Sequence, residues 1–207
     1  MKRYLVFVIF GVIFIGIITT YLLVITKSDV LKDIDGNHYL IKKYNDQIWM
    51  KENLKVTSDQ EGNPIKAFFP NNVLGNVENF GMLYDFETAC KVCPKGWHLP
   101  TYEEWIKLTY FIGHNSGDIL KDTLYWKNIN QRISNKSGFS IRPAGYGNSG
   151  EFDNFFGTHA IFWSATKVDS HFVWGFILDE KSDTIRKAPQ HPTYAFSVRC
   201  IKDNQSN

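Results

Sequence analysis

An uninterrupted run of uncharged residues near the N-terminus limits what this chain can be more than any other feature. The 22 residues from Tyr4 to Ile25 carry no charge, and as a helix they extend about 33 Å, enough for the hydrocarbon core of a bilayer, which is about 30 Å thick. A signal peptide cleaved at an unusual site is the alternative, although such peptides have a shorter apolar region and a small-residue cleavage site. The first alanine is Ala67, and no cysteine directly follows the run to accept a lipid. The sequence therefore predicts one uncleaved transmembrane helix over residues 4–25.

The charges that flank this run predict its orientation. Lys2, Arg3 and the terminal amine precede it, whereas acidic and basic residues are mixed after it. Because positive charge favours the cytoplasmic side, residues 1–3 are expected in the cytoplasm. Residues 26–31 then form a linker, and the rest of the chain is extracytoplasmic, either periplasmic or at the cell surface. The lipid bilayer is thus a predicted partner, contacted through residues 4–25.

The residues beyond the linker are expected to form one domain. Residues 32–203 suffice for one hydrophobic core and are few for two, and residues 204–207 form a tail. The whole chain has 23 basic and 21 acidic residues, and removing Lys2 and Arg3 leaves 21 of each. A neutral domain lacks the basic surface that nucleic acids require, so no nucleic-acid partner is expected.

The start of the domain predicts a turn followed by a β-hairpin. Turn-forming residues fill the segment 33–37. The hairpin strands are expected at residues 38–43 and 47–52, with their turn at residues 44–46. Asp33 and Asp35 suggest calcium binding, but the glycine of an EF-type loop is its sixth residue, whereas Gly36 is fourth. A plain Asx turn is therefore the expected structure.

One later segment, from Pro100 to Ile112, predicts a well-capped helix. Thr101 and Glu104 have the spacing of a capping box, in which each side chain accepts a hydrogen bond from the backbone of the other residue. Gly113 is a typical residue for the end of a helix. Trp105 lies on the apolar face, so we expect a core residue and not a platform for a ligand.

Two further segments alternate between apolar and other residues with a period of two, which is typical of β-strands. One apolar set is Phe172, Trp174, Phe176 and Leu178, and the other is Tyr194, Phe196, Val198 and Cys200. Both predict strands of an antiparallel sheet, and Trp163 is expected to be a buried anchor of that sheet. Five glycines between residues 138 and 157 predict a long, structured loop.

Six ordered motifs carry a resemblance to a known family. They are Asp33–Asn37, Gln47–Leu54, Cys93–Thr101 with Glu104 and Trp105, Ser137–Phe139, Trp163–Thr166 and Ser197–Cys200. In this order they resemble the pattern of the Fibrobacter succinogenes major paralogous domain, over residues 32–203. The resemblance implies an α+β, C-type-lectin-like fold with short antiparallel strands, one or two helices and long loops, distantly similar to the formylglycine-generating enzyme domain. It implies an exported or surface protein and no particular activity.

The chain has three cysteines, and outside the cytoplasm thiols pair where geometry allows. Cys90 and Cys93 have the C-x-x-C spacing of redox proteins, but the strand-then-helix context of such sites is missing, which argues against redox catalysis. Cys93 and Cys200 lie in two of the family motifs, and a lectin-like fold brings its terminal strands together. The resemblance therefore implies a Cys93–Cys200 disulfide, with Cys90 free or pairing in place of Cys93.

No combination of residues predicts an enzyme. The resemblance to formylglycine-generating enzymes would call for two closely spaced cysteines near the C-terminus, and only Cys200 is there. The six histidines lack the spacing of a zinc site, and no nucleophile has a recognisable base. The motifs of calcium-dependent lectins are missing, since the corresponding position reads Trp163-Ser164-Ala165. We therefore expect a non-catalytic domain without a metal or another cofactor.

A ligand, if bound, is expected at the loop from Pro143 to His159. The candidate ligand-binding residues are Tyr146, Asn148, Glu151, Asp153 and Asn154. Aromatic faces beside hydrogen-bonding groups suit a sugar ring. The alternative is that Phe152, Phe155 and Phe156 pin the loop to the core.

The function expected from these patterns is a membrane-anchored surface module that binds a glycan or a protein. A structural or assembly protein of the cell envelope, without a small ligand, is the alternative. An extracytoplasmic enzyme is a weaker alternative.

Overall fold

The computed structural model describes residues 30–113, 117–127, 133–147 and 155–204. The chain divides into two compact units, Met1–Val30 and Leu31–Asn207. The predicted transmembrane helix over residues 4–25 lies outside the described residues. Within the described ranges, no helix has the length and apolar character needed to cross a bilayer.

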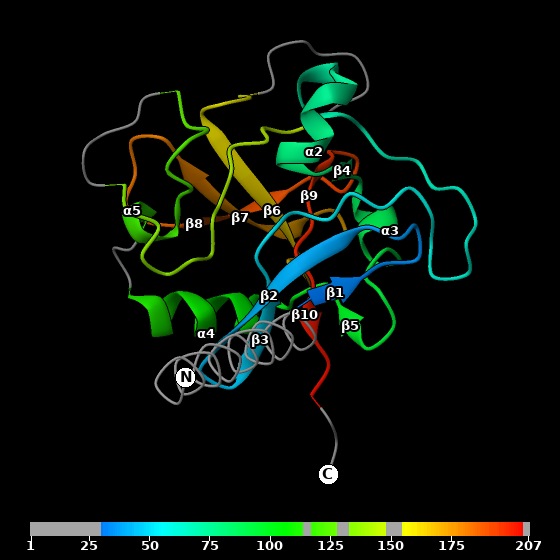
Figure 1. Ribbon diagram of the computed structural model, residues 1–207, viewed down its shortest axis with the longest axis horizontal. Coiled ribbons are helices and arrows are strands. Elements are labelled where there is room, and N and C mark those ends of the chain that lie inside the picture. The colour runs from blue at the N-terminus through cyan, green and yellow to red at the C-terminus, as the bar shows by residue number, and fades with distance from the viewer. Residues whose placement is uncertain (1–29, 114–116, 128–132, 148–154, 205–207) are drawn as a thin grey trace, which may run out of the picture. The chain divides into compact units, whose positions relative to one another are not determined.

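The second unit is built on two five-stranded β-sheets, and the first sheet contains strands from near both ends of the domain (Figure 1). Its strands are, in spatial order, β1 (Val30–Lys32), β2 (His38–Tyr44), β3 (Gln47–Met50), β10 (Ile201–Lys202) and β5 (Trp97–His98). β2 and β3 form the predicted hairpin, with Tyr44 opposite Gln47. Asn45 in the turn has a φ of 54°, a left-handed conformation that asparagine tolerates better than most residues.

The second sheet is mostly antiparallel, with one exception. Its strands are, in spatial order, β4 (Leu83–Tyr84), β9 (Phe196–Ser197), β6 (His159–Lys167), β7 (Val173–Asp179) and β8 (Arg186–Gln190). β7, which contains the segment predicted as an antiparallel strand, is antiparallel to both β6 and β8, and β8 itself was not predicted. β9 is antiparallel to β4 but parallel to β6, where Phe162 is opposite Ser197. The expectation of purely antiparallel strands is wrong here, because no hairpin connects β9 to either neighbour and fixes its direction.

α4 (Tyr102–Ile112) is the predicted helix. Thr101 is its N-cap residue, and the hydrogen bonds between Thr101 and Glu104 form the predicted capping box. The helix therefore begins two residues after Pro100, the predicted start. Trp105 is fully buried, and its indole donates a hydrogen bond of 3.2 Å to the carbonyl of Trp163, which is also fully buried. Both tryptophans are core residues, as expected.

The other described helices are single turns. They are α2 (Val77–Phe80), α3 (Phe86–Ala89), α5 (Gly117–Leu120) and the 3-10 helices η1 (Pro70–Asn72) and η2 (Leu74–Asn76). The domain is thus α+β with mostly sheet, as predicted. The expectation of one or two helices was too low, because a helix of four residues is too short to show an apolar periodicity.

Both faces of the second sheet are buried at β6 and β7. One face contributes Ile161, Trp163, Val173 and Ile177 to a core cluster, and the other contributes Ala160, Phe162, Phe176 and Leu178 to a second cluster around Trp105. The predicted alternation from Phe172 to Leu178 therefore describes only one face of β7. Phe172 itself is 40% exposed, since it precedes the strand. A strand with neighbours on both sides and cover on both faces has apolar residues at even and odd positions.

The segment from Tyr194 to Lys202 passes from the second sheet to the first. β9 and β10 belong to different sheets, so the one strand predicted here is two short strands. The alternation would leave Ala195, Ser197 and Arg199 facing solvent. They are instead at most 1% exposed, because the segment is packed on all sides where it changes sheets.

Cys93 and Cys200 form a disulfide bond, which confirms the pairing that the family resemblance implies. It lies next to the pairing of β5 with β10, where His98 is opposite Ile201. Both half-cystines are buried. Cys90 is a free, exposed cysteine.

The turn at residues 33–37 uses its carboxylates for internal hydrogen bonds. Asp33 accepts from the backbone N–H of Asn37 at 2.8 Å and from the hydroxyl of Tyr39 at 2.6 Å. Asp35 accepts from the backbone N–H and the hydroxyl of Thr57. A turn is present as predicted, but Asp33 accepts from the N–H four residues on and not two, so it is not a simple Asx turn. These contacts give both aspartates a structural role.

Candidate functional site

The candidate site is built on one face of the second sheet, where β6, β7 and β8 run side by side (Figure 1). Pairing places Ile161 opposite Ile177, and Ile177 opposite Arg186. Directly opposed residues project to the same face of a sheet, so these three side chains form one row. His159 on β6 and Gln190 on β8 project to the same face, because side chains two or four residues apart on a strand share a side.

Four aromatic rings stand beside this row. The ring centre of Tyr146 is 5.7 Å from that of Phe155, 5.7 Å from that of Tyr194 and 6.4 Å from that of Phe196. The rings of Tyr194 and Phe196 are stacked, with centres 6.0 Å apart and an angle of 30° between their planes. These separations are typical of aromatic pairs that stabilise one another. Tyr146 is therefore the centre of a connected group of rings.

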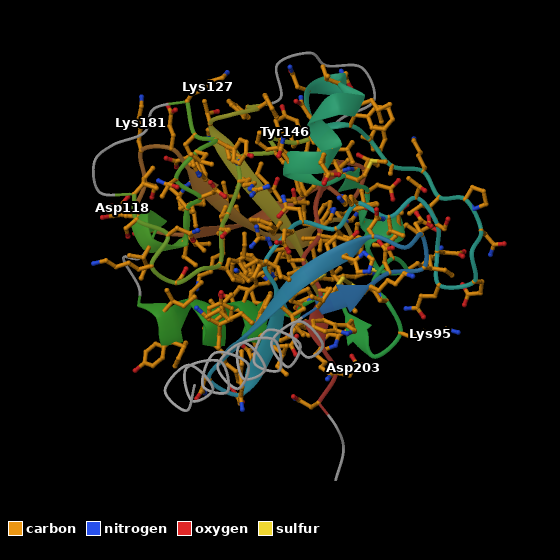
Figure 2. All side chains as sticks on the ribbon, in the orientation of Figure 1. Lys95, Asp118, Lys127, Tyr146, Lys181 and Asp203 are labelled. Atoms are coloured by element: carbon orange, nitrogen blue, oxygen red, sulfur yellow. A yellow bond between two sulfur atoms is a disulfide. The ribbon has the colours of Figure 1, made fainter. Side chains whose placement is uncertain are left out.

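The backbone around Tyr146 fixes the position of this ring. The N–H of Gly145 donates to the carbonyl of His159, and Gly147 exchanges two hydrogen bonds with Ala195. Tyr146 is thus held between β6 and the residue that precedes β9, and Figure 2 shows it beside β6. A Cβ atom at Gly147 would lie 3.2 Å from the Cβ of Ala195, so glycine permits this close approach.

Together these side chains line a cavity of about 350 Å³, which we call the aromatic pocket. Its lining residues are Tyr146, Phe155, His159, Ile161, Ile177, Arg186, Gln190, Tyr194 and Phe196. The volume lies within the range of pockets that bind small molecules. A second hollow of about 310 Å³ lies beside Cys93, but no aromatic ring lines it. The aromatic pocket therefore offers flat aromatic faces beside polar groups, whereas the second hollow offers only aliphatic and polar side chains.

Gly175 on β7 makes room for one of the polar groups. A Cβ atom at position 175 would lie 2.6 Å from the Cγ of Gln190, which is closer than two non-bonded carbon atoms can approach. The side chain of Gln190 therefore lies over the glycine. This contact directs the amide of Gln190 from the edge strand towards the middle of the sheet.

The charge of the aromatic pocket comes from Arg186. Burial, together with the nearby Arg186 charge, lowers the pKa of His159 more than the charges of Asp179 and Glu180 raise it, so the net pKa lies below 6.5 and the ring is neutral at neutral pH. The Nδ1 atom of His159 lies 3.0 Å from the hydroxyl of Thr158. The Nε atom of Arg186 lies 3.8 Å from the Oδ2 atom of Asp179, beyond hydrogen-bond distance. Among the lining residues, Arg186 carries the one full charge at neutral pH.

Two adjacent phenylalanines at the end of the predicted ligand loop have different roles. Phe156 is half-buried and packs edge to face on Phe80, with ring centres 4.7 Å apart. Phe155 is 46% exposed, borders the aromatic pocket and has a φ of 56°. A bulky residue rarely adopts that conformation, and such residues are frequent at binding sites. Phe156 packs on the core at Phe80, Phe155 packs on the rings of Tyr146 and His159 at the pocket, and Phe152 lies outside the described residues.

A separate polar cluster surrounds His98. Its Nδ1 atom is 2.6 Å from the Oδ1 atom of Asp203, and its Nε2 atom is 3.0 Å from the Oε1 atom of Glu104. Burial lowers the pKa of His98, but the hydrogen bonds with Asp203 and Glu104 raise it more, and the net pKa lies above 6.5. Because Glu104 also caps α4, this cluster connects β5, α4 and the end of the first sheet. Its role is structural.

A family model covers most of the domain. The model described as the Fibrobacter succinogenes major domain matches residues 43–202. The chain belongs to this family. Comparison with curated proteins finds no match, and comparison with solved structures finds none either. All lining residues of the aromatic pocket and both half-cystines lie within the matched range. The pocket is thus part of the Fibrobacter succinogenes major domain itself.

The structure brings one of the predicted ligand-binding residues into the pocket of this Fibrobacter succinogenes major domain. That residue is Tyr146. The other four, Asn148, Glu151, Asp153 and Asn154, lie outside the described residues, and their role stays a prediction. Tyr194 and Phe196 were predicted only as one face of a strand, but they contribute two of the four rings.

Arg186 and Gln190 were not predicted as site residues, because β8 was not predicted as a strand. Its sequence, Arg-Lys-Ala-Pro-Gln, has no apolar alternation. Its charges and Pro189 are typical of a strand at the edge of a sheet. That composition, directly after the turn that follows β7, was the one local indication of a further strand.

Proposed function

We propose that this Fibrobacter succinogenes major domain is a non-catalytic carbohydrate-binding module, with the aromatic pocket as its binding site. The observation that carries the proposal is the grouping of four aromatic rings with an amide, an imidazole and a guanidinium around one cavity. A sugar ring has apolar faces and a polar rim. Aromatic faces and hydrogen-bonding groups complement these two surfaces.

The chemistry of the lining supports binding rather than catalysis. Glycoside hydrolysis generally uses two carboxylates on either side of the scissile bond. The nine lining residues of the aromatic pocket include no carboxylate, no thiol and no serine or threonine hydroxyl. His159 has no carboxylate, thiol or aliphatic hydroxyl beside it among those lining residues. These groups suit recognition through stacking and hydrogen bonds.

The proposal places the module outside the cytoplasm, on a membrane anchor. The uncharged run at residues 4–25 and the positive charges before it support an anchor with its N-terminus in the cytoplasm. The Cys93–Cys200 disulfide supports an oxidising compartment. The proposal includes a C-type-lectin-like arrangement, supported by the six family motifs and by the adjacent β3 and β10, which come from near the two ends of the domain.

The proposed topology can be tested with protease on intact spheroplasts. The protease is expected to degrade the domain, because it lies outside the cytoplasm, while untreated membranes yield the full-length chain with Met1 included. Immunoblotting of the domain and N-terminal sequencing of the membrane fraction measure both results. Recovery of a soluble form that begins near residue 27 would contradict the anchor.

Removal of one aromatic ring from the pocket is expected to weaken carbohydrate binding about 10-fold, because a stacking contact contributes about 1 kcal/mol or slightly more. The variants are Tyr146→Ala and Tyr194→Ala in the full chain. A glycan array identifies the bound sugar, and isothermal titration then measures Kd for each variant. Tyr146→Phe keeps the ring and is expected to retain most of the affinity.

The matched control is Phe111→Ala, which removes an exposed aromatic ring from α4, away from the pocket. Its Kd is expected to equal that of the wild type. Circular dichroism of each variant separates loss of binding from loss of folding. If Tyr146→Ala and Tyr194→Ala are folded and bind the sugar unchanged, the aromatic pocket is not the site.

A further inference from the structure

The aromatic pocket has a net positive charge, and this narrows the class of ligand it can hold. Arg186 is its one charged lining residue at neutral pH, since the ring of His159 is neutral there. The nine lining residues include no aspartate or glutamate. The carboxylate of Asp179, 3.8 Å from the Nε atom of Arg186, offsets part of this charge but does not line the pocket, so a ligand there contacts a cation and no anion. Such a site favours an anionic ligand over a neutral one.

The position of Arg186 leaves its guanidinium accessible. Its side chain is 56% exposed, and its ion pair with Asp179 is loose at 3.8 Å. Among the described residues, the guanidinium makes no hydrogen bond within normal distance. In this part of the chain β8 pairs with β7 alone, so Arg186 stands at an open edge of the sheet. A ligand can reach its planar set of N–H donors from solvent.

Protection of an edge strand is the simpler explanation for a charged residue at this position. Two neighbours on β8 already serve that purpose. Pro189 cannot donate a hydrogen bond to an added strand. Lys187 is on the opposite face, where its ammonium lies 5.2 Å from the ring centre of Tyr102. Arg186 is the cation of this strand that faces the aromatic pocket, which edge protection alone does not require.

A guanidinium recognises carboxylates through two parallel hydrogen bonds, and this geometry gives it selectivity for planar anions. In the aromatic pocket the guanidinium stands in the same row as Ile161 and Ile177, with aromatic rings beside that row. The amide of Gln190, directed over Gly175, provides a neutral donor and acceptor. A fitting ligand thus has an apolar ring face, hydroxyl groups and one carboxylate attached to the ring.

We propose that the aromatic pocket binds acidic saccharides, namely uronic acid units of a polysaccharide, and that Arg186 pairs with their carboxylate. This inference rests on the proposed carbohydrate-binding function and assigns its ligand class. The rings hold the face of the pyranose, and Gln190 binds its hydroxyls. Arg186 is the residue that selects for charge.

The test compares oligosaccharides that differ at the carboxylate of each sugar unit. The probes are oligomers of galacturonic, glucuronic and mannuronic acid, their methyl esters, and the corresponding neutral hexose oligomers, titrated into the full chain in detergent. The wild type is expected to bind at least one oligouronate about 10- to 100-fold more tightly than its ester, because a charge-assisted, bidentate contact is lost in the ester. Higher salt is expected to reduce this preference.

The variant Arg186→Gln is expected to remove the preference by weakening binding of the oligouronate to the level of the ester, while ester binding stays unchanged. The control variant is Lys181→Gln, which removes an exposed cation from the turn after β7 (Figure 2). It is expected to keep the full preference. Tyr194→Ala is expected to weaken acid and ester alike.

The possible results separate this inference from the proposed function. Binding of neutral oligomers that depends on Tyr194 but shows no preference for any uronate would overturn the acidic-ligand inference and leave the carbohydrate module intact. A preference for uronates that survives in Arg186→Gln would overturn the assignment of Arg186. Binding to none of the probes, nor to any glycan on an array, would overturn both.

Discussion

Replacing Arg199 with methionine is expected to lower the free energy of unfolding by about 3–5 kcal/mol, because three acceptors lose a charged donor and each such loss costs about 1–3 kcal/mol. Arg199 is 1% exposed, and burial lowers its pKa to about 9, so the side chain stays charged at neutral pH. Methionine has a similar length and fills most of the space. The loss therefore measures the polar contacts of the guanidinium more than its packing.

Those contacts join three separate parts of the domain. The guanidinium donates to the Oδ1 atom of Asn53 at 2.8 Å, to the carbonyl of Ser140 at 2.8 Å and to the carbonyl of Phe139. It lies over the rings of Phe139 and Phe162, 4.6 and 5.4 Å from their centres. Without it, two buried acceptors and one partly buried acceptor lose their donor, and each such loss costs about 1–3 kcal/mol before relaxation.

Urea unfolding of the full chain, followed by tryptophan fluorescence, measures this effect. Arg199→Lys keeps the charge but not the planar set of donors, so a smaller loss is expected. The control is Lys202→Met, which replaces an exposed cation on β10 and is expected to change stability by less than about 0.5 kcal/mol. If Arg199→Met is as stable as Lys202→Met, the network around Arg199 does not hold these segments together.

The elements that could be predicted from the sequence are those specified by adjacent residues. The β2–β3 hairpin follows from a turn between two short apolar runs, and α4 follows from Thr101, Glu104 and a helical apolar face. The interactions that stabilise these elements are local in sequence, because capping and turn formation depend on residues within a few positions. These predictions therefore did not require knowledge of the rest of the fold.

The burial of Arg199 could not be predicted in the same way. The alternation around it predicts a strand with one exposed side, and Arg199 falls on that side. Its burial depends on a change of sheets between β9 and β10 and on acceptors about 60 and 146 residues away in sequence. No local pattern records contacts between residues so far apart.

Only part of the candidate site could be predicted, because its residues too are brought together from distant parts of the sequence. Tyr146 was selected from the composition of its loop. Arg186 and Gln190 lie on an edge strand whose apolar content is too low to be recognised, and the pairing of β6, β7 and β8 brings them to that loop. The pocket is a property of the sheet register, which a single sequence does not specify.

Removal of the disulfide is the second change with a large expected effect. The double variant Cys93→Ala/Cys200→Ala is expected to lower the free energy of unfolding by about 4–5 kcal/mol, since the bond closes a loop of 107 residues and restricts the unfolded chain. Both sulfur atoms are buried beside the β5–β10 pairing. The loss of packing adds to the entropic effect.

The comparison that isolates this bond uses Cys90→Ala, which removes the free, exposed cysteine and is expected to leave stability within about 0.5 kcal/mol of the wild type. Urea unfolding with and without a reductant gives a second reading, because reduction is expected to destabilise the wild type and Cys90→Ala but not the double variant. Non-reducing peptide mapping identifies the bond directly. A peptide that joins Cys90 to Cys93 would contradict the Cys93–Cys200 pairing. A double variant as stable as the wild type would show that this disulfide does not stabilise the domain.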